Sequence, residues 1–239
     1  MWQPSGLCKS LDNLRRRTAF SSKMNCLVVA VVLLFSFTAD ARVGNSSEPT
    51  SYCTETKECL LFDLICKGDE YEVRHYDATK WVTTEAESMF KDVAKMIAFR
   101  KLYKYITGEN EAGAKIDMTA PVITKVEEET PLLEKSIYIL SFLLPSAYQK
   151  QPPKPNDGTV YFTDMPDMKV YVKSFGGWMV SAVATMYSNQ LKEALDEAQA
   201  TYNTDYHYDV GYNSPMKLMN RHNEVWYEVK GSPVCPSVE

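Results

Sequence analysis

The alternation of apolar and polar residues after position 58 predicts a series of short strands. Within Tyr71–Tyr76 the side chains alternate, so that Tyr71, Val73 and His75 fall on one face of a strand. Similar signals, rich in β-branched and aromatic residues, predict further strands at 80–87, 118–126, 137–144, 160–163, 169–175, 179–187, 206–212 and 224–230. The polar, proline-rich stretch 145–158 predicts a surface loop.

Two stretches instead repeat their apolar residues at helical spacing. The first ends before Gly108, and its predicted apolar face consists of Phe90, Val93, Ala94, Ile97, Ala98, Leu102, Tyr105 and Ile106. The second is expected to begin at Ser188 or Asn189, which are both good N-caps. Its predicted apolar face consists of Leu191, Ala194, Leu195 and Ala198.

The order strand, strand, helix, strand, strand occurs twice, which indicates a diverged internal duplication. Closing the strands of both repeats into one sheet would remove the exposed edge strands. We therefore expect an α+β fold, a distorted antiparallel β-barrel built from two β-β-α-β-β repeats with two flanking α-helices.

The first 41 residues differ from the rest of the chain. Basic residues precede an eleven-residue apolar run, 27–37, and a small-x-small pattern ends at Ala41. The run is shorter than the ~20 apolar residues that span a bilayer, so we predict a secretory signal peptide at 1–41 rather than an uncleaved anchor. Translation from either Met1 or Met24 is compatible with it. Residues 42–58 are polar and predict a disordered linker, which leaves a folded domain at 59–236.

Charge and cysteine content agree with an extracellular protein. Without residues 1–41 the chain keeps 21 basic and 29 acidic residues, a net charge of −8, which argues against nucleic acid and anionic membranes as partners. The cysteines that remain are Cys53, Cys59, Cys66 and Cys235. In an oxidising compartment they predict two disulfides in one of three pairings, and every full pairing joins the N-terminal segment to the tail. Asn45 begins a glycosylation sequon.

Four stretches of the chain resemble the SOUL family of heme-binding proteins. They are Y-E-V-R-H-Y with the following K-W-V-T-T (80–84), L-Y-K-Y-I-T-G (102–108), K-I-D-M-T-A-P-V (115–122) and G-Y-N-S-P-M-K-L-M-N-R-H-N-E-V-W (211–226). The resemblance covers about 71–230 and implies a distorted β-barrel with two helices that binds a tetrapyrrole. The predicted signal peptide and cysteines depart from the best-known animal members, which are cytosolic and lack disulfides.

The resemblance also implies a binding site. His75 falls on the histidine that serves as an axial heme ligand in some members, and imidazole is a common ligand of heme iron. By the same resemblance, the residues expected to form the apolar slot and to contact the propionates are Phe99, Leu102, Tyr103, Lys104 and Lys217. The alternatives are a hydrogen-bonded strand histidine, core packing for Phe99 and Leu102, and solvated surface lysines.

The sequence contains no motif of a nucleophilic, metal-dependent or nucleotide-dependent enzyme. We therefore expect a secreted, monomeric or weakly dimeric protein that carries or buffers heme or a related tetrapyrrole. The alternative is a protein-interaction module that kept the fold without the ligand and uses the second helix, 190–200. A weaker alternative is the binding of small amphipathic ligands.

Overall fold

The structure is a computed structural model that describes residues 42–45, 50–128 and 134–236. These residues belong to one compact unit of the chain. The predicted signal peptide lies outside the described residues, as do Ser46 and Ser47 of the sequon, whereas Asn45 itself is exposed. Over the described ranges, no helix is both long and apolar enough to cross a bilayer.

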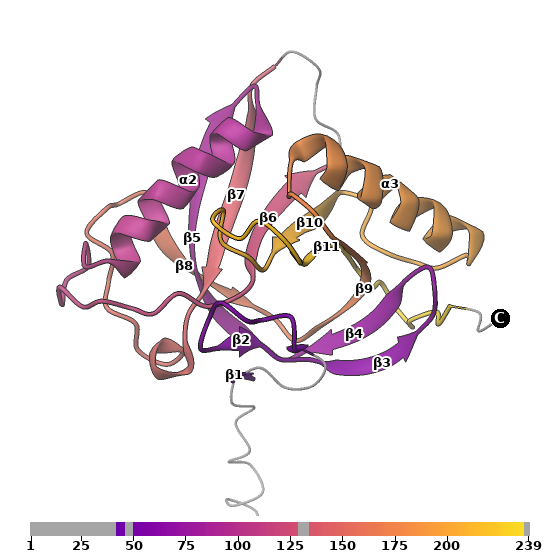
Figure 1. Cartoon of the computed structure of the whole chain (residues 1–239), viewed down its shortest axis with the longest axis horizontal. Coiled ribbons are helices and arrows are strands. Elements are labelled where there is room, and N and C mark those ends of the chain that lie inside the picture. The colour runs from indigo at the N-terminus through magenta and orange to yellow at the C-terminus, as the bar shows by residue number, and fades with distance from the viewer. Residues whose placement is uncertain (1–41, 46–49, 129–133, 237–239) are drawn as a thin grey trace, which may run out of the picture. The chain divides into compact units, whose positions relative to one another are not determined.

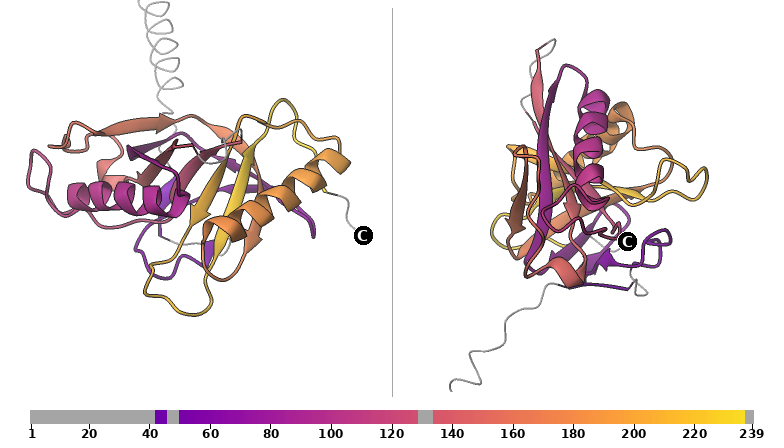
Figure 2. Two further views of the ribbon diagram at one scale, coloured as in Figure 1. Left: turned by 90° about the horizontal axis from the view of Figure 1, so that it is seen from above. Right: turned by 90° about the vertical axis from the view of Figure 1, so that its left-hand side faces the viewer.

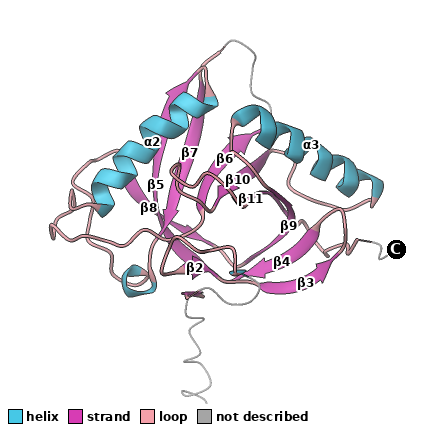
Figure 3. Cartoon of the chain, viewed as in Figure 1, coloured by secondary structure: helices cyan, strands magenta, loops and turns pink. Residues whose placement is uncertain are grey.

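The described chain is an α+β fold with one large antiparallel sheet and two long helices (Figures 1 and 3). The sheet has nine strands in the order β3-β4-β9-β11-β10-β6-β7-β5-β8. Their bounds are β3 Asp63–Lys67, β4 Glu72–Tyr76, β5 Thr79–Ser88, β6 Val122–Glu127, β7 Ser136–Leu143, β8 Val160–Met165, β9 Met168–Phe175, β10 Tyr206–Gly211 and β11 Asn223–Glu228. The helices are α2 Lys91–Ile106 and α3 Ser181–Glu197, and a short 3-10 turn lies at Ser146–Tyr148.

The predicted duplication is visible in the sheet. The repeats are β4-β5-α2-β6-β7 and β8-β9-α3-β10-β11, and they meet where β6 pairs with β10. The first strand of each repeat pairs with the second strand of the other repeat: β4 pairs with β9, and β8 pairs with β5. The two halves are therefore joined by an exchange of equivalent strands, which the order of elements along the chain could not reveal.

Two short connections carry this exchange. Asp77 and Ala78 join β4 to β5, and Pro166 and Asp167 join β8 to β9, although each pair of strands lies near opposite ends of the sheet order. A step of three residues spans at most about 11 Å, so the two ends of the sheet approach each other here. No ladder joins the edge strands β3 and β8 in the described chain, and closure into the predicted barrel is not confirmed.

Both faces of the sheet are buried. On one face α2 packs on β5 and β7, and α3 packs on β9 and β11 (Figure 2). Side chains of opposite parity point to the other face, as Trp81 beside Val82 and Trp226 beside Val225 illustrate. There they form one cluster with Phe62 and other residues of the segment before β3. The fold therefore has a helix-covered face and an opposite face that the curved sheet and the N-terminal segment seal.

The second helix starts earlier than the sequence indicated. A strand at 179–187 and a helix start at Ser188 or Asn189 are both wrong, because α3 begins at Ser181. The β-branched residues in 179–187 produced the strand signal, but Ala184, Ser188, Leu191 and Leu195 are the residues that α3 buries, at helical spacing. The hydroxyl of Ser181 donates to Asp92 Oδ1 at 2.7 Å, so α2 provides the acceptor at the start of α3. The local sequence cannot predict this contact, because the two residues are 89 positions apart in the chain.

The first helix forms as predicted, but its buried face is narrower. Ala94, Ala98, Leu102, Tyr105 and Ile106 are buried. The side chains of Phe90, Val93 and Ile97, which were assigned to the same face, are exposed. The exposed part of α2 therefore carries apolar side chains near its N-terminal end.

The expected disordered linker is wrong for the described part of 42–58. The strand β1, Val43–Gly44, pairs with β2, Cys59–Leu60, and Val43 is buried in the sealed cluster. Cys53 forms a disulfide with Cys59, and Cys66 forms one with Cys235. The second bond ties the N-terminal region to the tail, as every pairing considered from the sequence required.

Candidate functional site

A groove opens on the helix-covered face where the two repeats meet. Its floor is formed by Val122 and Thr124 of β6, Leu140 of β7 and Gly211 of β10. Lys95 and Phe99 of α2 form one wall, and the segment before α3 and the β10–β11 loop form the other. The groove has a volume of about 250 Å³. Strands from both halves of the duplication thus meet beneath a single apolar cavity.

Arg221 holds together the two segments of the second wall. Its guanidinium donates to the carbonyls of Ser214 and Lys217, both at 2.7 Å, and to those of Gly177 at 3.1 Å and Asn213 at 3.3 Å. It also lies 4.4 Å from the ring centroid of Trp178. Gly177 has a φ of +81°, which favours glycine at this turn. The wall is therefore set by a side chain in one loop that binds backbone in both.

A buried carboxylate lies under the groove. Asp209 Oδ2 is 2.9 Å from Lys95 Nζ and 3.0 Å from Lys91 Nζ, and Oδ1 lies 3.5 Å from Nε2 of the buried His207. Burial alone would raise the pKa of Asp209, but the two ammonium groups and His207 outweigh it and hold that pKa far below its usual range. Lys95 therefore has a carboxylate partner within the protein, which it shares with Lys91.

The rim of the groove exposes large apolar side chains. In the β10–β11 loop, which is seen between α2 and α3 in Figure 1, the exposed fractions are 87% for Met216 and 77% for each of Leu218 and Met219. Trp178 in the opposite part of the wall is 48% exposed. Exposed apolar surface of this kind marks interaction and ligand sites more often than ordinary surface.

Other clefts of the described chain are more polar. One of about 470 Å³ lies beside the C-terminal part of α3 and is lined by Asp69, Glu70 and Glu197 among others. Another, of about 510 Å³, lies between the N-terminal ends of the two helices and includes Asp92, Glu128 and His207. An apolar ligand therefore fits the smaller groove better than either of these larger clefts.

The residues predicted on α2 divide between the groove and its surroundings. Phe99 lines the groove and packs edge-to-face on Phe142, with ring centroids 5.0 Å apart. Tyr103 stacks on Phe99 one turn further along and is exposed. Leu102 is fully buried beneath α2, in agreement with the alternative of core packing. Lys104 is on the exposed side of the helix, 3.5 Å from Glu109.

Lys217 lies in the β10–β11 loop that forms the second wall. Its Nζ donates to Thr54 Oγ1 at 3.2 Å, and it forms no ion pair among the described residues. The predicted proximity of this loop to α2 is thus observed, since the groove lies between Phe99 and the loop residues Asn213 and Pro215.

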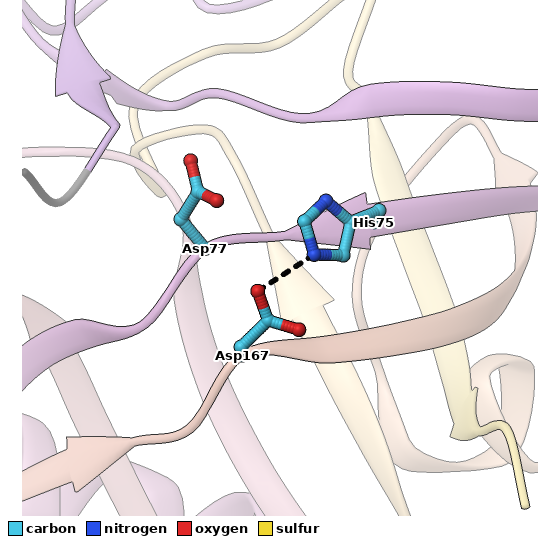
Figure 4. Close-up of side chains that lie close together, drawn as sticks. All are labelled: His75, Asp77 and Asp167. Carbon is cyan, nitrogen blue, oxygen red and sulfur yellow. Dashed lines mark hydrogen bonds and ion pairs between the residues drawn. The ribbon is translucent and has the colours of Figure 1, made fainter. Parts of the chain in front are cut away.

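His75 is not near the groove. It lies on β4 and is not among the residues that line the groove. Its Nε2 is 2.8 Å from Asp167 Oδ2 (Figure 4), and its Nδ1 is 3.7 Å from Asp63 Oδ2. The structure therefore does not bring His75 together with Phe99, Tyr103 and Lys104. Its carboxylate contacts are those of the alternative, a strand histidine with a hydrogen-bond partner.

The groove contains residues that the sequence reading did not select. Lys95, Trp178, Met179 and Arg221 all line it. Arg221 lies inside the long stretch 211–226 that carried the family resemblance, and Trp178 ends the conspicuous F-G-G-W stretch. The aromatic residue after two glycines was the available signal, but only the tertiary fold shows that it faces Arg221.

Comparisons with known proteins agree on one family. The SOUL heme-binding protein family model matches residues 57–228. Human heme-binding protein 2 is 40% identical over 163 residues, covering 68% of this chain and 80% of that protein, and the mouse protein of the same name is 38% identical over 72% and 83%. Heme-binding protein 1 of Xenopus tropicalis is 34% identical over 69% and 88%. The matched region includes every residue that lines the groove, and the family and its relatives are described as binding proteins rather than enzymes.

Proposed function

The chain belongs to the SOUL heme-binding protein family, and from that membership we propose that it binds heme or a related tetrapyrrole in the groove between its helices. The observation that carries the proposal is the apolar groove, bordered by Trp178 and Phe99 and continued by the exposed apolar residues of the β10–β11 loop. Aromatic and aliphatic walls with a few polar groups are typical of sites for flat organic ligands.

The size of the groove indicates how a macrocycle would lie. Its volume of about 250 Å³ is slightly below the roughly 300–1,000 Å³ of enclosed ligand pockets. A tetrapyrrole would therefore be seated partly in the groove and partly against the rim of Met216, Leu218 and Met219. A bound heme supplies an iron centre with axial positions for further ligands.

The cations near the groove differ in their freedom to bind propionates. Lys95 is paired with Asp209, which it shares with Lys91, and Arg221 uses four of its five N–H donors on backbone carbonyls. Lys217 is half-buried, and its Nζ donates only to the Thr54 hydroxyl. We assign the main propionate contact to Lys217, with a second at the remaining N–H of Arg221 and a third at Lys104 for a ligand that extends along α2.

The proposal places this binding outside the cell. The predicted signal peptide at 1–41 and the disulfides Cys53–Cys59 and Cys66–Cys235 support that location, because disulfides persist in oxidising compartments. Glycosylation of Asn45 is part of the same proposal. In that setting the protein would carry or buffer tetrapyrroles released from cells.

A hemin titration followed by the Soret absorbance tests the function. The purified protein is expected to give a saturable shift, and Trp178→Ala is expected to weaken binding by about tenfold, since an aromatic contact with a ligand is worth roughly 1–3 kcal/mol. Tyr161→Ala is the matched control, because Tyr161 is also a partly exposed aromatic residue but lies on β8, away from the groove.

The same titration with His75→Ala tests the predicted axial ligand. Saturable binding with an unchanged Soret band in His75→Ala would keep the groove and remove His75 from heme ligation. A shift weakened by His75→Ala but not by Trp178→Ala would move the site to β4. No saturable shift at micromolar protein would contradict the proposal and favour the protein-interaction module.

A further inference from the structure

A second group of potential ligand atoms lies at the junction of the two repeats. His75, Asp77 and Asp167 each offer one ligand atom, and these atoms all lie within 4.8 Å of one another (Figure 4). His75 is the residue before the last in β4, Asp77 lies in the connection to β5, and Asp167 lies in the connection from β8 to β9. One nitrogen and two carboxylate oxygens thus converge from segments that are about 90 residues apart in the chain.

The strand exchange explains why these residues meet. The two-residue connections β4–β5 and β8–β9 are equivalent positions of the two repeats, and each passes from one end of the sheet order to the other. β4 and β9 pair with Tyr76 opposite Met168, so the connections leave the ladder side by side. Asp77 and Asp167 are therefore fixed near each other by the register of the sheet.

The surroundings carry excess negative charge. A third carboxylate, Asp63, lies 3.7 Å from Nδ1 of His75, on the side of the ring opposite Asp167. Arg42 is one cation of the cluster, with Nη1 2.5 Å from Asp63 and Nε 3.7 Å from Asp77. Three carboxylates face Arg42 and Lys169, which pairs with His75 across β4 and β9, so a net charge of about −1 remains while the imidazole is neutral, and a bound divalent cation would offset it.

We propose that His75, Asp77 and Asp167 form a binding site for a divalent transition-metal ion of the Zn²⁺ class. Zn²⁺ binds imidazole nitrogen and carboxylate oxygen at about 2.0–2.2 Å, which puts tetrahedral ligands roughly 3.4 Å apart. The 2.8 Å contact between His75 and Asp167 opens slightly and Asp77 moves inward to reach that spacing. The nitrogen ligand disfavours Ca²⁺ and Mg²⁺, which prefer oxygen ligands.

Asp63 has the position of an outer-shell partner. Metal-bound histidines usually direct their other ring nitrogen at a carboxylate or a carbonyl, which orients the ring. Here Nδ1 faces Asp63, and Arg42 holds that carboxylate in place. The hydrogen bond from Arg42 is the main cause of a lowered pKa of Asp63, which favours its anionic form. The exposed side chain of Asp167 leaves the fourth coordination position open to water.

Zinc titration of the tag-free, full-length protein by isothermal calorimetry tests the site. We expect one saturable site and a Tm that rises with zinc concentration, because the ion binds ligands that only the folded sheet brings together. Asp167→Asn and His75→Ala are each expected to weaken zinc binding by at least about tenfold. Asp117→Asn is the matched control, since both aspartate side chains are 66% exposed and Asp117 lies outside the cluster.

Three results would overturn the proposal. They are the absence of saturable zinc binding, binding that survives both Asp167→Asn and His75→Ala, and Ca²⁺ binding as tight as that of Zn²⁺, which would indicate a plain acidic cluster. Trp178→Ala is expected to bind zinc normally. The zinc and hemin titrations therefore test the metal site and the tetrapyrrole groove independently.

Discussion

The two faces of the sheet use charge in opposite ways. On the sealed face, Arg74 and Glu224 are 3% and 0% exposed, their side chains are 2.9 Å apart, and the hydroxyl of Tyr212 and the indole of Trp226 also donate to Glu224. On the helix-covered face, Arg221 lines the groove and binds only backbone carbonyls and the Trp178 ring, and the half-buried Lys217 of the same loop donates to the Thr54 hydroxyl. Charges on the first face are satisfied inside the protein, whereas the second face retains charge and apolar surface for a partner.

The comparison separates stability from binding. Variants of the sealed face should change the free energy of unfolding by several kcal/mol, because each removes a partner from a buried polar group. Variants of the groove rim should change stability little, because their side chains already contact water. The predictions below test this division, beginning with the largest expected loss of stability.

Arg74→Met should cause the largest loss. It removes the guanidinium that contacts Glu224 and Glu72 and leaves the Glu224 carboxylate buried without its cation. We expect a loss of about 3–5 kcal/mol in the free energy of unfolding, measured by urea denaturation. The double variant Arg74→Met/Glu224→Gln should lose less than the sum of the single variants, since the unpaired charge is gone. A loss below about 1 kcal/mol for Arg74→Met would contradict a sealed, structural face.

Removal of the Cys66–Cys235 disulfide should follow. This bond closes a segment with a sequence separation of 169 residues, whereas Cys53–Cys59 closes one of six. Replacement of both Cys66 and Cys235 by serine should cost about 2–5 kcal/mol, and loop-closure entropy predicts a smaller cost for the Cys53–Cys59 pair. Thermal unfolding of the two double variants provides the comparison. Equal losses would indicate that the short loop is stabilised by its packing in the sealed cluster.

Acid should weaken the sealed face through Glu224. Burial alone would raise its pKa, but Arg74, His222 and the Trp226 N–H outweigh burial and lower the pKa from 4.5 to about 2. A carboxyl whose pKa is lower in the folded state stabilises the fold above its unfolded pKa, and that contribution is lost as pH falls toward the folded value. We expect a loss of about 3 kcal/mol between pH 5 and pH 2, followed by urea unfolding at each pH.

Glu224→Gln isolates this contribution. The pKa of Glu128, on the helix-covered side, is also lowered to about 2, chiefly by hydrogen bonds from His207 and Tyr227 that overcome burial, so the natural protein should lose stability from both groups. The Gln variant should start less stable at pH 5 and decline less steeply toward pH 2. An unchanged slope would assign the acid sensitivity to Glu128 instead.

These tests also mark what the sequence could predict. Alternation and runs of β-branched and aromatic residues located β4 to β11, and helical spacing identified α2, but the exposed edge strand β3 was not predicted. The start of α3 was missed because its first turn binds Asp92 of the other repeat. The strand exchange was missed for a related reason, since pairing between distant strands leaves no local signal.

The candidate site was predicted less well than the fold. Phe99 and the loop that contains Lys217 lie on the same groove, and only the loop belongs to a long stretch of the family resemblance, 211–226. His75 was assigned to the same site because an apolar strand face with a histidine suits heme chemistry. Its neighbours Asp63 and Asp167 come from other strands and connections, so only the fold shows that its ring is surrounded by carboxylates.

Lys217→Glu should have the smallest effect on stability and a clear effect on binding. The Nζ group holds only the Thr54 hydroxyl at the surface, so the free energy of unfolding should change by less than about 0.5 kcal/mol. Affinity for protoporphyrin IX should fall by about tenfold or more, because an ammonium near the propionates is replaced by a carboxylate. Affinity for its dimethyl ester, which lacks those charges, should stay the same.

Lys135→Glu is the matched control for this last prediction. Lys135 is an exposed lysine just before β7, near Glu87 and outside the groove. The same change of net charge there should leave both affinities intact, which separates a direct contact from a general electrostatic effect. Equal losses for the porphyrin and its ester in Lys217→Glu would mean that Lys217 shapes the loop. The remaining N–H of Arg221 would then make the propionate contact. The rim of the groove would contribute apolar contacts only.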